Sequence, residues 1–303
     1  MEERRSLFDQ ILLSPDERRL RLFWRLAVTF IMLMIFIVVF GIPAVILTGP
    51  AALTIDETGL LINAVVFTLA ATLTIFLARR WVDRRSFVSL GLHWDRYAWR
   101  DILAGIGISG LMIGLVFLIE LAAGWLRFEA FAWQLQPASA VLRGLLLMLA
   151  TFILVGWTEE LISRGYLLQN LEEAFNLLWA VVISSLVFGL AHVANPNFSV
   201  AATVGLFLAG LFLAYGYVST RALWLPIGLH IGWNFFEGTV FGFPVSGAES
   251  FKLIYQSVSG PVLFTGGSFG PEAGLVLLPG LLFGAGAIYL YTLGRKKVQR
   301  DDR

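Results

Sequence analysis

The chain has no cysteine and few charged residues. Without cysteine, disulfide bonds, thiolate metal ligands and a cysteine nucleophile are all excluded. Charged side chains make up 14% of the 303 residues, whereas a soluble domain carries about a quarter. Hydrophobic residues make up 58%, which is more than the core of a soluble domain could bury. The composition therefore predicts that the lipid bilayer surrounds much of the chain.

Long apolar runs divide the chain into eight segments, each close to the ~20 residues that a helix needs to cross a bilayer. The runs do not alternate between polar and apolar residues, which disfavours an outer-membrane barrel. The first run is too long for a signal peptide and lacks a convincing cleavage site, so we expect it to be retained. We predict an all-α polytopic membrane protein with helices at about 26–47, 60–79, 101–124, 140–158, 175–193, 200–218, 222–240 and 274–294.

Arginine and lysine predict the orientation of these helices. With the N-terminus inside, 18 of the 22 basic residues fall in cytoplasmic segments, and the outside holds only Arg127, Arg143 and Lys252. Cytoplasmic loops carry such an excess of basic residues. We therefore expect both termini in the cytoplasm.

These features define five regions of the chain. A basic cytoplasmic segment, 1–25, precedes the N-terminal helices and an interfacial segment, 26–138. The region 139–240 holds unusual polar residues, and we interpret the Gly-, Ser- and Pro-rich stretch 241–273 as an external loop. The last helix and a basic cytoplasmic tail occupy 274–303.

Three short stretches place ionisable or amide side chains inside helices of the region 139–240. Such groups are costly within a membrane and mark functional sites by default. With a rise of about 1.5 Å per residue, the three stretches can reach a similar depth and form one site. Their polar residues are Glu159, Glu160 and Arg164, then His192, then His230 and Asn234.

The first stretch contains two acids with different surroundings. Glu160 and Arg164 are four residues apart and can form an ion pair, which is more often structural. Glu159 points about 100° away from its neighbour and has no partner within its own turn. Because a buried charge without a partner costs several kcal/mol, the position of Glu159 favours a function.

Other polar residues have simpler interpretations. Taken alone, His192 and His230 each fit a hydrogen bond between helices as well as they fit a functional role. Asn234 alone favours a structural role. Glu120 and Glu237 lie near the expected outer ends of their helices. We expect these two acids to reach the membrane interface.

The ordered set Glu-Glu-x-x-x-Arg, Phe-x-x-x-His and His-x-x-x-Asn resembles the signature of the CPBP family. These are CAAX prenyl protease and bacteriocin-processing intramembrane endopeptidases, also called Abi or type II CAAX proteases. The match covers about 159–234, and the stretch 241–273 departs from the family pattern. The resemblance implies an eight-helix fold with a site in a membrane cavity, located in the cell membrane of a prokaryote. It also implies a membrane-associated or prenylated protein or peptide as substrate, the lipid bilayer as surroundings, and no nucleic acid.

The resemblance further implies roles for the acids and for the first histidine. It makes Glu159 the general base of an intramembrane endopeptidase, and Glu160 the partner of Arg164. His192 then helps to hold and activate water.

The third stretch supplies the implied oxyanion donors, His230 and Asn234. They are four residues apart and share a helix face, and one such donor is worth about 3 kcal/mol in a low-dielectric cavity. Without cysteine, the nucleophile is water or a hydroxyl group. Ser163 and Thr158 flank the acids, but water activated by Glu159 is the simpler choice.

The residues leave the need for a metal open. Glu159, His192 and His230 could hold a catalytic zinc as one carboxylate and two imidazoles. The sequence lacks the His-Glu-x-x-His spacing, in which two zinc ligands share a helix. Members of the CPBP family have been described both as metalloproteases and as metal-free glutamate proteases. We expect either no required cofactor, which we favour, or one divalent metal such as zinc.

Two other classes of function also fit the polar residues. The acids and histidines could relay protons or bind a solute in a transporter. Transporters often have helices broken by glycine, and Gly105, Gly107, Gly110 and Gly114 of the third helix fit either such a break or close helix packing. A catalytically silent immunity or scaffold protein is the second alternative.

Overall fold

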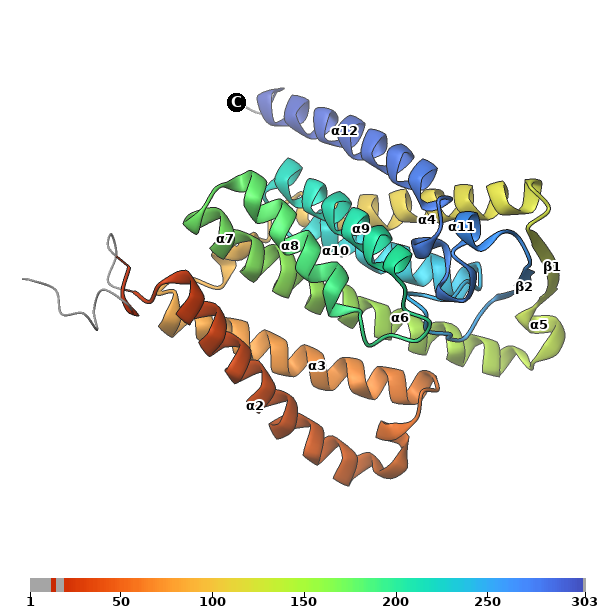
Figure 1. Ribbon diagram of the computed structural model, residues 1–303, viewed down its shortest axis with the longest axis horizontal. Helices are drawn as coiled ribbons and strands as arrows, with labels where there is room; N and C mark the ends of the chain where they lie inside the picture. Colours follow the sequence, from red (N-terminus) through yellow and green to blue (C-terminus); the bar gives the residue numbers. More distant parts are fainter. Residues whose placement is uncertain (1–11, 15–18, 302–303) are drawn as a thin grey trace, which may run out of the picture.

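The computed structural model describes residues 12–14 and 19–301. The predicted basic segment 1–25 therefore falls largely outside the described residues, as does the end of the tail. Most helices run roughly along the long axis of the molecule (Figure 1). They are α2 (Leu22–Thr48), α3 (Glu57–Leu77), α4 (Ala98–Ala122), α6 (Ala138–Glu160), α8 (Leu177–Ala191), α9 (Val200–Thr220), α10 (Trp224–Asn234) and α12 (Leu277–Asp301).

The all-α membrane architecture is confirmed. Within the described ranges, six helices are long and apolar enough to cross a membrane, and the shorter α8 is also apolar. Helix α10 has 11 residues and continues as the π-helical segment Phe235–Val240. Each of the eight predicted segments thus contains a helix, but two of these helices are shorter than expected.

Helix α6 continues beyond its predicted end at 158. It passes into the π-helical segment Leu161–Leu167 and then into α7 (Leu168–Ala174). The π-helical segment begins directly after Glu160 and contains Arg164. Since π-helical turns are rare and frequently occur at functional sites, this irregularity marks the region of the acids.

Helices α4 and α10 pack closely because glycines face each other. A Cβ atom at Gly228 of α10 would overlap the carbonyl oxygen of Ile102, and one at Gly105 of α4 would overlap the backbone nitrogen of Leu229. The Ser109 hydroxyl donates to the Leu229 carbonyl at 2.7 Å. Helix α4 is unbroken, so Gly105 and Gly110 serve close packing, whereas Gly107 faces open space.

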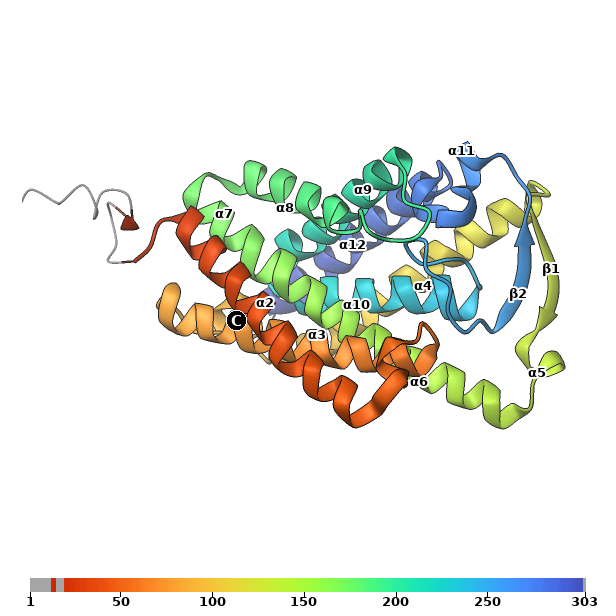
Figure 2. The same cartoon turned by 60° about the horizontal axis from the view of Figure 1, so that its bottom comes forward.

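Two strands lie at the end of the molecule away from the C-terminus (Figures 1 and 2). Strand β1 (Leu126–Phe131) pairs antiparallel with β2 (Ile254–Val258), with Leu126 opposite Val258. The region 241–273 also contains α11 (Val262–Thr265) and short 3₁₀ turns, Gly267–Phe269 and Pro271–Ala273. The stretch that we interpreted as a loop is therefore folded against the helices, although the sequence predicted no strand.

The two acids expected at the membrane interface are buried, so that prediction is wrong. Glu120 and Glu237 are both 0% exposed. The chain folds back after each of them: the Trp125 N–H donates to the Glu120 carbonyl and the Phe243 N–H to the Glu237 carbonyl, both at 2.9 Å. The residues that follow Glu120 and Glu237 thus cover the helix ends that we expected to be exposed at the membrane interface.

Candidate active site

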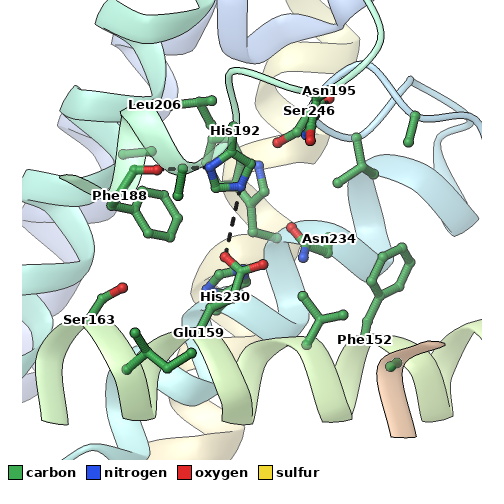
Figure 3. A pocket seen from close by; sticks show the side chains of 18 of the residues that line it. Phe152, Glu159, Ser163, Phe188, His192, Asn195, Leu206, His230, Asn234 and Ser246 are labelled. Carbon is green, nitrogen blue, oxygen red and sulfur yellow. Dashed lines mark hydrogen bonds and ion pairs between the residues drawn. The ribbon is translucent and has the colours of Figure 1, made fainter. Parts of the chain in front are cut away.

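The fold brings all three polar stretches together around one cavity (Figure 3). Glu159 and Glu160 lie at the end of α6, and Arg164 follows in the π-helical segment. His192 is the first residue after α8. His230 and Asn234 lie on α10, which packs against both α6 and α4.

Glu159 lies between the two histidines. Its Oε2 atom is 3.8 Å from His192 Nε2 and 3.7 Å from His230 Nε2. Both separations are too long for direct hydrogen bonds. The Glu159 side chain is 26% exposed, whereas that of Glu160 is 0% exposed. The Glu159 carboxylate is therefore open to the cavity and free to accept hydrogen bonds from a bound molecule.

Glu160 is a buried link between three segments. Its Oε1 atom accepts hydrogen bonds from Arg164 Nη1 and from His230 Nδ1, both at 2.8 Å. The second guanidinium nitrogen of Arg164 donates to the Gly210 carbonyl at 2.9 Å, and the guanidinium lies 4.5 Å from the centre of the Phe188 ring. The predicted pair of Glu160 with Arg164 is present, and the same acid also orients a histidine 70 residues away.

Hydrogen bonds assign the same tautomer to both histidines. His192 Nδ1 lies 2.8 Å from the Phe188 carbonyl oxygen, and His230 Nδ1 lies 2.8 Å from the Glu160 carboxylate. Because a carbonyl and a carboxylate only accept, both Nδ1 atoms carry hydrogen. In the neutral imidazoles, each Nε2 then presents a lone pair towards Glu159.

The cavity has a volume of about 660 Å³. Its polar wall contains Glu159, both histidines, Asn234 and Ser163. Much of the remaining lining is apolar, with side chains such as Phe30 and Phe67 from α2 and α3. The Thr158 hydroxyl is instead paired with that of Thr68 at 2.7 Å. A polar centre beside an apolar chamber suits a reaction on an apolar substrate.

Sequence reasoning missed Glu272 as part of the cavity wall. It lies in the region interpreted as an external loop, yet it is 4% exposed and lines the cavity. Burial raises the pKa of the Glu272 carboxyl above its ordinary value, although hydrogen bonds from Ser246 act in the opposite direction. One signal was available: Glu272 is the only charged residue between Lys252 and Arg295.

Comparison with known proteins finds a family match over the region that contains the three polar stretches. Residues 141–236 match the family described as "Type II CAAX prenyl endopeptidase Rce1-like". The chain is also 29% identical over 141 residues to "Putative membrane peptidase YdiL" of Bacillus subtilis (strain 168). That alignment covers 43% of this chain and 56% of the relative, so the chain spans little more than half of the relative's length. No solved structure matches the chain significantly.

The fold defines a class of protein, an integral membrane protein with apolar helices around a partly polar cavity. Both matches agree with the resemblance drawn from the three motifs. Residues 141–236 are thus similar to the type II CAAX prenyl endopeptidases.

Proposed function

We propose that the chain is an intramembrane endopeptidase in which Glu159 activates water to hydrolyse a peptide bond. The observation that carries this proposal is the position of the Glu159 carboxylate, 3.7 and 3.8 Å from the imidazole Nε2 atoms of His230 and His192, at the wall of the cavity. A general base must lie within hydrogen-bond reach of the water that it activates. The side of the Glu159 carboxylate that faces the cavity can hold this water.

The reaction follows from the groups in place. Glu159 takes a proton from water while the water oxygen attacks the carbonyl carbon of the substrate. Negative charge then develops on the carbonyl oxygen, where hydrogen-bond donors stabilise it. When the C–N bond breaks, Glu159 returns the proton to the leaving nitrogen. The products are a carboxylic acid and an amine.

The hydrogen bonds of the site distinguish the two oxyanion donors. Asn234 can donate from its amide nitrogen in any protonation state. His230 already donates its Nδ1 hydrogen to Glu160, so its Nε2 donates only when the ring is the imidazolium cation. We therefore assign Asn234 as the constant donor and His230 as a donor in its charged form.

The cavity lining supports an apolar substrate. Phenylalanine and aliphatic side chains of α2, α3, α6 and α8 form much of the wall. A membrane-associated or lipidated protein or peptide can place an apolar segment there, with its peptide bond at Glu159. Prenylated substrates fit this chemistry and agree with the description of the matching family.

A divalent metal such as zinc also suits these donors. Glu159, His192 and His230 would hold it, because both Nε2 lone pairs face the carboxylate. The Nδ1 hydrogens are bound to a carbonyl and a carboxylate, as is usual for histidine ligands. Zinc would supply a Lewis acid that lowers the pKa of water. Within the described ranges, no group of three such side chains is spaced closely enough to hold an ion, so binding would require small side-chain movements.

The test compares membranes that contain wild-type protein with membranes that contain Glu159→Gln at matched expression. The amide keeps the shape of the acid but loses the base, so we expect turnover to fall at least about a thousandfold. Proteomic analysis should reveal a new terminus near a helix end only with the wild type. Glu129→Gln, on exposed strand β1, is the matched control and should cleave normally. Equal cleavage by wild type and Glu159→Gln would refute the proposal.

A further inference from the structure

A chain of hydrogen bonds lies along the wall of the cavity opposite the acids of α6. The Asn195 side chain donates to the Ser246 carbonyl at 2.9 Å. The backbone N–H and the hydroxyl of Ser246 both donate to Glu272 Oε2 at 2.7 Å. Trp233 Nε1 donates to Glu272 Oε1 at 3.1 Å. Both carboxylate oxygens of the buried Glu272 therefore accept hydrogen bonds.

The two ends of this chain lie next to the two histidines. Asn195 is three residues after His192, in the turn that follows α8. Trp233 is three residues after His230 and directly precedes Asn234 on α10. The carboxylate and Ser246 thus connect the segment of one histidine with the helix of the other. All four residues of the connection line the cavity.

The backbone of the Glu272 segment also lies close to α9, because a Cβ atom at Gly205 would overlap the Glu272 carbonyl oxygen. A buried carboxylate is costly, and it also interacts electrostatically with His192. A buried acid whose three hydrogen-bond donors come from Ser246 and from α10 points to a role in the geometry of the site.

We propose that Glu272 is a positioning residue of the hydrolytic site. Through Ser246 and Asn195 it holds the turn of His192, and through Trp233 it holds the helix of His230. Together these bonds fix the spacing of the two imidazoles around Glu159. The inference rests on the proposed peptidase function and gives a role to the region 241–273, which departs from the family pattern.

Glu272→Gln is the direct test of this role. All three partners of Glu272 are donors, so an amide must turn its NH₂ group towards at least one of them. We expect kcat to fall about ten- to a hundredfold, because small displacements of catalytic groups have effects of that size. KM should stay within about twofold. Ser246→Ala removes one donor but keeps the backbone N–H, and should cause a smaller fall in kcat. Glu129→Gln is the control and should leave both constants unchanged.

A second measurement does not depend on peptidase activity. Because the chain has no cysteine, Ala194→Cys places a single spin label on the exposed turn between His192 and Asn195. The label should become more mobile in Glu272→Gln and in Ser246→Ala, but not in Glu129→Gln. Each variant is compared at equal amounts of folded protein.

The two measurements separate failure of the inference from failure of the proposed function. If the wild type cleaves and Glu159→Gln does not, unchanged kcat in both network variants overturns the positioning role. Unchanged label mobility also overturns it, whether or not any cleavage is found. If no variant and no wild type cleaves, the peptidase function fails, and increased mobility would still support the connection between the two segments.

Discussion

The Glu160 carboxylate joins a buried guanidinium and a buried imidazole through one oxygen. Arg164 and His230 each lie 2.8 Å from Oε1, and Arg164 is 1% exposed. Removing one partner of a buried pair leaves the other charge without compensation, at a cost of about 3–5 kcal/mol. The Glu160–Arg164 pair therefore stabilises the fold only while both residues are present. The hydrogen bond from His230 to Glu160 has a separate effect, because it orients an imidazole of the site.

Glu160→Gln should therefore reduce both stability and activity, but for different reasons. We expect a loss of about 3–5 kcal/mol in unfolding free energy, measured by denaturation in detergent. In the double variant Glu160→Gln with Arg164→Met, the unpaired charge is also removed, so stability should recover in large part. Turnover should stay low, because the amide is a weaker acceptor for His230 Nδ1. Recovery of full turnover in the double variant would contradict the assigned role of Glu160.

Sequence spacing predicted contacts within one helix but not between helices. Glu160 and Arg164 share a helix face and their pair was expected. The contact of Glu160 with His230 joins residues 70 positions apart, and no periodicity reports such a pair. Glu272 was missed for the same reason: its partners Trp233 and Ser246 lie 39 and 26 positions away.

Helix α10 is buried along its whole length and lies against both α4 and α6. Gly228 and Gly232 face the backbone of α4 at Ile102 and Ile106. Gly156 of α6 lies against Ile231, where a Cβ atom would be 2.7 Å from that side chain. Small residues at such positions let membrane helices approach closely. The helix that carries His230 and Asn234 therefore lies in close contact with both neighbours.

Gly228→Ala should therefore destabilise the protein. The new methyl group would overlap the Ile102 carbonyl oxygen, and overpacking costs about 1–3 kcal/mol or more. Gly107→Ala in α4 is the matched control, because a Cβ atom there meets nothing within 4 Å. That control should be neutral, or more stable by up to about 1 kcal/mol, because alanine favours helix formation. The stability of each variant is measured as its unfolding midpoint in detergent. Equal midpoints for the two variants would show that α4 and α10 are not packed this closely.

The helices were predictable, whereas the strands were not. Each membrane helix has its own long apolar run, which is a local signal. Strand β1 pairs with β2, more than 120 residues later, and the two strands are short. The region 241–273 lacks a long apolar run, and its structure depends on contacts with the helices that it covers. Its sequence therefore carries little local signal of its structure. For this reason an acid on the cavity wall was interpreted as part of an external loop.

At the scale of the whole molecule, the start of α2 and the C-terminus lie at one end of the long axis, and β1 and β2 lie at the other (Figures 1 and 2). Most basic residues lie in the segments expected at the first end. We predict that this end faces the cytoplasm. The sheet, the region 241–273 and the cavity wall formed by Glu272 would then lie towards the outer side.

Single cysteines test this orientation, because the natural chain has none. Ser257→Cys lies on an exposed position of β2, and His93→Cys lies on an exposed position of the loop before α4. In intact cells, a maleimide that cannot cross membranes should label the first variant, and it should label the second only after permeabilisation. The cysteine-free parent controls for background labelling. The reverse pattern would invert the molecule in the membrane, and Glu272 would then line the cytoplasmic side of the cavity.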